Sequence, residues 1–95
     1  IEKRRWILID CDPTRTAGSN SSEAELGYAL ETQRRIRQFL KERGFPEPIS
    51  LMSGNGCHLL YRVDLPADAT ETVRSFLKAL ASIFNDKHVK VDTTV

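Results

Sequence analysis

The stretch "ISLMSGNGCHLLYRV", residues 49–63, decides the fold. Two apolar runs lie on either side of a Gly-Asn-Gly segment, and Asn-Gly is the strongest short-range signal for a tight β-hairpin. Residues 49–53 and 57–63 are therefore predicted to be antiparallel strands joined by a turn. His58 stands directly after the turn, at the start of an apolar strand, and the role of this lone polar ring depends on what lies beside it.

On the N-terminal side of the hairpin, one strand and one helix are predicted. Residues 4–12 form a short run rich in β-branched and aromatic residues, which is typical of a strand. Residues 13–21 are rich in Pro, Gly, Ser, Thr and Asn, which indicates a loop. A capping box at Ser22 and Glu25 predicts the start of a helix, and Gly44 predicts its end.

On the C-terminal side, the pattern predicts a second helix and a fourth strand. Residues 64–68, "DLPAD", are expected to break the hairpin's second strand. Asp68 and Glu71 are expected to cap the helix. Residues 85–88 end this helix, and residues 89–95, "VKVDTTV", read as the last strand.

The resulting order, β-α-β-β-α-β, is that of the α+β ferredoxin-like (RRM-like) fold. Right-handed crossovers place the four antiparallel strands in the order 4-1-3-2, with both helices on one face of the sheet and the other face open. The 95 residues are predicted to form a single domain. Because the chain starts at Ile1 and stops at Val95, directly after a strand, we expect it to be an excerpt of a larger protein.

Composition removes several classes of protein from consideration. The formal net charge of +1, with 40% hydrophobic and 28% charged residues, is ordinary for a globular chain. No apolar run is long enough for a membrane span, and no signal peptide is visible. Cys11 and Cys57 both lie in predicted strands, and nothing else indicates a disulfide framework. We interpret them as reduced core residues of an intracellular, cytoplasmic protein.

Alternation along the first strand predicts which side chains face away from the helices. The apolar residues Ile7, Ile9 and Cys11 should meet the helices. Asp10 and Asp12 then project from the open face, about 6.5 Å apart at roughly 3.3 Å per residue. Two carboxylates are thus predicted at the C-terminal end of a central strand.

Strand order brings further polar groups to the same end. The first strand lies between the third and the fourth, so Asp10 and Asp12 should meet His58 on one side and Asp92 on the other. Carboxylates this close repel one another unless a cation sits among them, and hard oxygen ligands suit Mg²⁺ or Mn²⁺. Two such ions about 4 Å apart are the usual device for in-line phosphoryl transfer. The sequence therefore predicts a two-metal site at Asp10, Asp12 and Asp92.

The glycine turn beside this site offers groups that bind phosphate. Main-chain N–H groups of "SGNG", residues 53–56, are unobstructed by side chains and suit triphosphate oxygens. His58 is predicted to donate to the same phosphates. Arg15, in the loop after the aspartates, either reaches a phosphate or is an ordinary solvated arginine.

Three motifs resemble those of the archaeo-eukaryotic primase (primase-polymerase) superfamily. "WILIDCDP", residues 6–13, resembles its motif I, an apolar strand that ends in Asp-x-Asp. "SGNGCH", residues 53–58, resembles motif II, in which a serine and a histidine flank a glycine turn. "VKVDTT", residues 89–94, is similar to motif III, an apolar strand that ends in one acidic residue. The motifs follow the family's order, and the resemblance extends over nearly the whole chain.

The resemblance is greatest to the catalytic cores of phages, plasmids and integrated elements, and it implies a template-directed nucleotidyltransferase. It implies nucleoside triphosphates as substrates, a single-stranded DNA template with a primer, and a helicase domain in the same protein or a partner, in the cytoplasm of a prokaryotic host. The catalytic residues implied are Asp10, Asp12, His58 and Asp92, with the three aspartates as metal ligands. The nucleotide-binding residues implied are Ser53, Gly54, Asn55, Gly56 and His58, and Arg15 joins them if it reaches a phosphate.

A non-catalytic RRM-like module that binds single-stranded nucleic acid is the main alternative. Such modules read bases with aromatic residues on the two central strands, where only Trp6 is aromatic in this chain. Trp6 and Leu8 point outward, and an exposed apolar strip usually marks an interface. We expect another part of the protein to cover it, and the stacking of a base on Trp6 is the alternative.

A second alternative stays among enzymes: a palm-type polymerase or a nucleotide cyclase on a similar sheet. Those enzymes place a second acidic pair on the central hairpin. This hairpin carries His58 instead, which favours the primase-like site.

Overall fold

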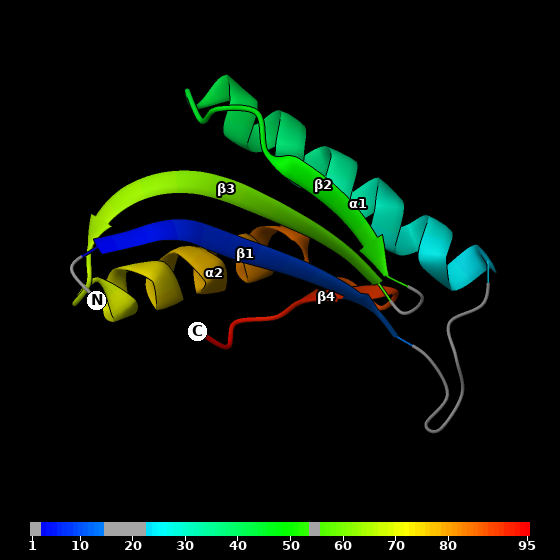
Figure 1. Cartoon of the computed structure of the whole chain (residues 1–95). Coiled ribbons are helices and arrows are strands. Elements are labelled where there is room, and N and C mark those ends of the chain that lie inside the picture. Colours follow the sequence, from blue (N-terminus) through cyan, green and yellow to red (C-terminus); the bar gives the residue numbers. More distant parts are fainter. Residues whose placement is uncertain (1–2, 15–22, 54–55) are drawn as a thin grey trace.

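The computed structural model describes residues 3–14, 23–53 and 56–95. The elements follow one another as β1 (Lys3–Pro13), α1 (Glu23–Glu42), β2 (Ile49–Ser53), β3 (Gly56–Pro66), α2 (Thr70–Phe84) and β4 (Val89–Val91). The strands form one antiparallel sheet in the order β2-β3-β1-β4, and both helices lie behind it in Figure 1. The predicted ferredoxin-like fold and its strand order are therefore confirmed.

The hydrophobic core lies between the sheet and the helices. Every second residue is buried from Ile7 to Pro13 of β1 and from Cys57 to Tyr61 of β3, as the alternation predicts. These residues pack against a stripe on each helix, and the burial of such apolar surface is the main stabilising term of the fold. The core comprises Ile7, Ile9, Cys11, Cys57, Leu59, Tyr61, Val89 and Val91 from the sheet, and Ala29, Ile36, Leu40, Val73, Leu77 and Leu80 from the helices.

Helix α1 ends where the sequence predicts. Gly44 has a φ of +88°, in the left-handed region that glycine adopts at little cost. The N–H of Gly44 donates to the carbonyl of Lys41 at 3.1 Å, and the N–H of Phe45 donates to that of Leu40 at 3.0 Å. This pair of bonds closes the last turn and directs the chain into β2. Within the described residues, neither helix combines the length and the apolar character that crossing a membrane requires.

Buried Gln33 attaches α1 to the hairpin. Its side-chain amide donates to the main-chain carbonyl of His58 at 2.8 Å and to that of Leu51 at 3.3 Å. A buried amide needs such partners because leaving it unpaired would cost about 1–3 kcal/mol. The helix is therefore connected by hydrogen bonds to the strand that carries His58.

Three boundaries differ from the predictions. Strand β3 continues through the "DLP" segment to Pro66, because Leu65 packs against the core and Pro66 still pairs with Lys3 of β1. Strand β4 has only the three residues Val89–Val91 instead of the predicted seven. Helix α2 starts at Thr70, and Ala69 occupies its N-cap position without a side-chain cap, so the predicted cap at Asp68 is wrong. The predicted capping residue Ser22 lies outside the described residues.

The short β4 leaves part of β1 with only one neighbouring strand. β4 pairs with β1 at Cys11, Asp12 and Pro13 alone. From Lys3 to Ile9, β1 is paired with β3 on one side and with no strand of the described chain on the other. The central strand of the sheet is therefore an edge strand over most of its length.

The two cysteines lie directly opposite each other on β1 and β3 and are both free and buried. Burial raises the pKa of Cys11 to about 12 and also raises that of Cys57. A thiol with so high a pKa is a poor nucleophile at neutral pH. Both residues therefore act as small core residues, as predicted.

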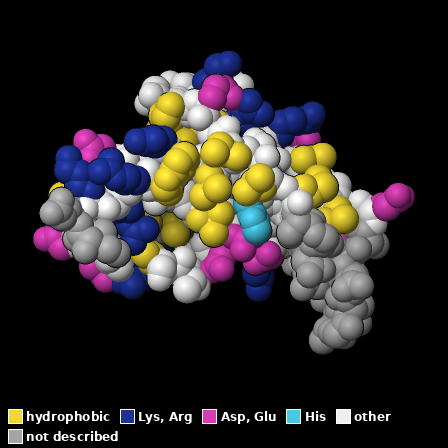
Figure 2. All heavy atoms as spheres, viewed as in Figure 1, with side chains coloured by type: hydrophobic (Ala, Val, Ile, Leu, Met, Phe, Trp, Pro, Cys, Tyr) yellow, Lys and Arg dark blue, Asp and Glu magenta, His cyan; other side chains and the backbone are white. Residues whose placement is uncertain are grey.

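The face of the sheet opposite the helices is open and carries a mixture of side chains. Figure 2 views this face: hydrophobic side chains gather at its centre, and a histidine and acidic groups lie beside them. Trp6 and Leu8 of β1 are 42% and 47% exposed, and Asp10 is half-buried. The outward set predicted for β1 is confirmed.

Candidate metal centre

A row of side chains crosses the open face at Asp10. Asp10 pairs with His58 of β3, which pairs in turn with Leu51 of β2. On the other side, the main-chain N–H of Asp92 donates to the carbonyl of Asp10 at 2.9 Å. This bond continues the β1–β4 ladder by one residue beyond Val91, so Asp92 lies beside Asp10 although it follows the strand.

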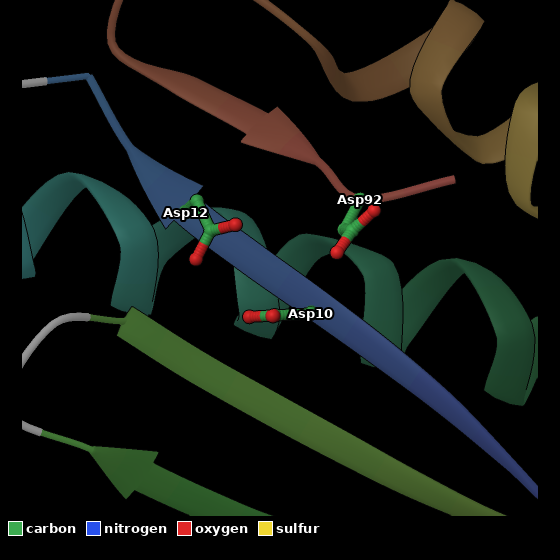
Figure 3. Close-up of side chains that lie close together, drawn as sticks. All are labelled: Asp10, Asp12 and Asp92. Atoms are coloured by element: carbon green, nitrogen blue, oxygen red, sulfur yellow. The ribbon is translucent and has the colours of Figure 1, made fainter. Parts of the chain in front are cut away.

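Three carboxyl groups come together at this place. One oxygen from each of Asp10, Asp12 and Asp92 can be chosen so that all lie within 4.8 Å of one another. Figure 3 shows the three groups gathered over the ends of β1 and β4. Asp10 is half-buried and the other two are exposed, so the cluster is open to solvent on one side. The predicted meeting of acids from distant parts of the sequence is confirmed.

His58 touches the innermost carboxylate. Its Nε2 lies 3.1 Å from Oδ1 of Asp10, and the two side chains are 29% and 23% exposed. Oδ1 itself is shielded from solvent and accepts no well-aligned hydrogen bond from the described residues. The short distance therefore records an electrostatic contact, and a buried carboxylate oxygen remains without a hydrogen-bond donor.

The surroundings of Asp10 oppose its ionisation. Burial raises the pKa of Asp10, the negative charges of Asp12 and Asp92 raise it further, and His58 partly offsets them. A nearby divalent cation would reverse this balance by favouring the ionised form. A cation bound at this place would therefore favour the ionised form of Asp10.

The arrangement passes a simple test of fit for a metal. The donors are carboxylate oxygens, which hard divalent cations prefer, and an octahedral Mg²⁺ spans about 4 Å between opposite ligands at 2.0–2.1 Å each. The 4.8 Å limit on the three oxygens is close to this span. The oxygen of Asp10 that lacks a donor supplies a further reason for a cation. The described residues thus contain an acidic cluster that could hold metal.

Glycine at position 56 keeps β3 close to this site. A Cβ at Gly56 would lie 2.8 Å from the carbonyl oxygen of Cys11 and 3.2 Å from Oδ1 of Asp12. Any side chain would push the start of β3 away from β1, because real Cβ atoms essentially never approach to 2.8 Å. Gly56 therefore fixes the separation of the strands that carry His58 and the aspartates.

The predicted phosphate-binding turn is described only in part. The main chain of Ser53 ends β2 and pairs with Gly56 of β3, which confirms the hairpin. Gly54, Asn55 and Arg15 lie outside the described residues, as does the side chain of Ser53. Their predicted contacts with phosphate remain predictions.

Two features of the site have no signal in the sequence. One is Gln33, which looks like any polar residue on a basic helix but holds the carbonyl of His58. The other is a cavity of about 150 Å³ beside Asp10 and Asp92, where β1 lacks a neighbouring strand. Arg4 lines it, with a buried Nε that has no hydrogen-bond partner. Both depend on tertiary packing that a residue pattern does not encode.

No protein-family model matches the chain. Comparison with curated proteins and with solved structures likewise gives no match. The chemical interpretation of the site rests on its own geometry and on the three motifs.

Proposed function

We propose that the chain carries the catalytic acids of a metal-dependent nucleotidyltransferase of the primase-polymerase type. The observation that supports this most is the meeting of Asp10, Asp12 and Asp92 within 4.8 Å on the open face of the sheet. The three motifs predict this meeting from the sequence alone. Neighbouring carboxylates repel one another unless a cation lies among them, which supports a metal at this place.

In this proposal the aspartates hold two ions, Mg²⁺ or Mn²⁺. When bound, the ions would neutralise the triphosphate and promote attack of a 3′-hydroxyl on the α-phosphate, with loss of pyrophosphate. The chain's own contribution is to fix the ligands on paired strands, so that little reorganisation is needed during the reaction. Pairing of β1 with both neighbours at Asp10 and beyond provides this rigidity.

His58 is assigned to the phosphates of the incoming nucleotide. Its Nε2 contacts Oδ1 of Asp10 but is poorly aligned for a hydrogen bond to it. The ring is also partly exposed on the same face as the aspartates. An N–H group in this position can donate to a phosphate oxygen held by the ions, which adds a charge-assisted hydrogen bond. The glycine turn next to it would supply main-chain donors.

Substitution of the aspartates tests the proposal in the intact protein. Asp10→Asn, Asp12→Asn and Asp92→Asn should each lower primer synthesis by about 10³-fold, because loss of a metal ligand removes several kcal/mol of charge stabilisation. The control is Asp64→Asn, an exposed acid of β3 whose ion pair with Lys3 is at the surface and is therefore worth little. Normal synthesis by the Asp10→Asn variant would falsify the metal assignment.

A second measurement separates the role of His58 from that of the acids. His58→Ala should mainly raise the KM for the nucleotide, whereas the aspartate variants should mainly lower kcat. Titration with Mn²⁺, followed by the paramagnetic signal of the free ion, should show binding to wild type and to His58→Ala. Binding should be lost in Asp12→Asn. An unchanged KM in His58→Ala would remove this residue from the nucleotide site.

The alternative, a non-catalytic module for single-stranded nucleic acid, keeps one observation in its favour: an exposed Trp6 on a central strand. The acids at the centre of the face argue against it, since they repel a phosphate backbone unless metal intervenes. Calorimetry with a nucleoside triphosphate, with and without Mg²⁺, separates the two. Nucleotide binding that needs the metal supports the enzyme, and its absence in the intact protein favours the module.

A further inference from the structure

An apolar band continues from the metal centre along the open face. We define the apolar band as five outward side chains of the three paired strands: Trp6, Leu8, Ile49, Leu51 and Leu60. Strand pairing fixes their arrangement, because residues opposite each other across a ladder lie on the same face. Leu8 is opposite Leu60, which is opposite Ile49, so these three make a row next to the row of Asp10.

The apolar band is largely exposed to solvent, which is unfavourable for apolar side chains. Trp6, Leu8, Ile49 and Leu51 are each 42–48% exposed, although they are large hydrophobic residues. Figure 2 shows that hydrophobic side chains gather at the centre of this face. Contiguous exposed patches of this kind usually mark interaction sites. A ligand with apolar surface is therefore indicated.

The two ends of the band differ from its middle. At one end lie His58 and the three carboxylates, which could hold cations. At the other end Arg62 pairs with Trp6, and its guanidinium carbon lies 5.6 Å from the centre of the indole ring. No acidic partner of Arg62 is found among the described residues. Successive rows are about 6.6 Å apart, at roughly 3.3 Å per residue, so about 13 Å separates the rows of Asp10 and Trp6.

We infer that the apolar band binds a single strand of nucleic acid that runs along β1 from the metal centre toward Arg62. Single-stranded nucleic acid combines flat apolar bases with anionic phosphates, and the face offers an apolar middle between an acidic cluster that could hold cations and an arginine. Base–aromatic stacking and an arginine above the ring are the usual means of sequence-tolerant binding.

The inference rests on the proposed function, since it names the surface that takes the template or primer strand of that reaction. It chooses base stacking as the role of Trp6 and gives Arg62 a role that none of the three motifs assigns. It also modifies the expectation that another part of the protein covers Trp6, because a covered indole could not meet a base.

The chain is well suited to a direct test because Trp6 is its one tryptophan. Addition of a short single-stranded oligothymidine in Mg²⁺ should quench the fluorescence of Trp6 and saturate. With a fluorescein-labelled oligothymidine, Trp6→Ala and Arg62→Ala should each weaken binding by about 5- to 150-fold, as loss of 1–3 kcal/mol of stacking would give. Trp6→Phe should keep most of the affinity, because it retains an aromatic face.

Matched controls are available elsewhere on the surface. Arg35→Ala removes an exposed arginine of α1, and Ile83→Ala removes an apolar side chain of α2 that is 55% exposed. Both should bind like wild type, and circular dichroism should show that all variants are folded. Equal losses in Arg35→Ala and Arg62→Ala would overturn the inference, because the attraction would then be general charge alone.

Three further outcomes contradict the inference. The first is that the oligothymidine does not bind, and the second is that it binds without quenching Trp6. The third is that the fluorescence changes with protein concentration instead, in which case a second copy of the chain would be the ligand of the apolar band. None of these outcomes contradicts the metal centre, provided that the aspartate variants of the whole protein have lost primer synthesis. Conversely, quenching by oligothymidine with unimpaired Asp10→Asn synthesis would overturn the proposed function and not the band.

Discussion

The two faces of β1 differ although they share one backbone. On the face toward the helices, Ile7, Ile9 and Cys11 are 0–5% exposed and belong to the core. On the other face, Trp6 and Leu8 remain more than 40% exposed, and Asp10 and Asp12 face each other's charge. The inner face is explained by folding alone. The outer face is not, because large apolar side chains remain exposed there and burial and neighbouring charges oppose the ionisation of Asp10.

The largest expected effect is a difference in stability between substitutions of two adjacent residues, one on each face of β1. Ile9→Ala should lower the free energy of unfolding by about 2–5 kcal/mol, since a buried aliphatic side chain is lost and a cavity remains. Leu8→Ala, one residue away on the open face, should change it by about 0.5 kcal/mol or less, as exposed substitutions do. Urea unfolding followed by circular dichroism measures both.

Equal losses for the two variants would mean that the open face is covered in solution. In that event sedimentation should show an oligomer. A loss in Ile9→Ala alone supports the comparison and leaves Leu8 available for binding.

The next effect concerns the outer face, where metal binding should raise the free energy of unfolding. At a Mg²⁺ or Mn²⁺ concentration of 100 times its dissociation constant, the free energy of unfolding should rise by about 2.7 kcal/mol, because the ion binds the folded state. Thermal unfolding with and without EDTA measures the rise. Asp12→Asn should abolish it, whereas Asp64→Asn should retain it. A rise that persists in Asp12→Asn would place the ion elsewhere.

Gly56→Ala should produce an intermediate effect that reaches both faces. The new methyl group meets the carbonyl of Cys11, and overpacking of this kind costs about 1–3 kcal/mol. The same displacement moves His58 away from Asp10, so nucleotide affinity in the intact protein should fall as well. Gly27→Ala is the control, because nothing lies within 4 Å of a Cβ there. Unchanged stability in Gly56→Ala would show that the strands can separate at no cost.

The smallest effect concerns the charge of Asp10 in the metal-free protein. Its pKa is raised above the usual 3.8, chiefly by burial, so the folded state binds a proton more tightly than the unfolded state. The penalty is therefore fully present at neutral pH and is relieved as the pH falls through the raised value toward 3.8. Asp10→Asn should be more stable than wild type at pH 7 in EDTA, and the difference should shrink on acidification. A difference independent of pH would contradict this account.

Much of the fold could be predicted from the sequence because local signals agreed with one another. The alternation of Ile7, Ile9 and Cys11 fixes which face of β1 is buried, and the hairpin between Ser53 and Gly56 fixes the neighbour of β3. Handedness of the crossovers then leaves one strand order. The meeting of Asp10 and Asp92 follows from that order without any knowledge of side-chain positions.

What could not be predicted depends on contacts between distant residues. Strand β3 overruns its apparent breaker because Leu65 finds a place in the core, which local turn propensity cannot reveal. The link from Gln33 to the carbonyl of His58 requires α1 to pack at one particular height on the sheet. The cavity beside Arg4 arises because β4 stops at Val91, and the sequence suggested a longer strand.

The brevity of β4 has a consequence for the site as a whole. Asp92 is held beside β1 by three paired residues and one additional hydrogen bond, whereas Asp10 lies within a strand of eleven residues. A fraying last segment would carry its carboxylate away and leave the other two behind. A divalent ion bound to all three carboxylates would link β1 to the segment that follows β4. Binding of the ion and docking of that segment would therefore favour each other.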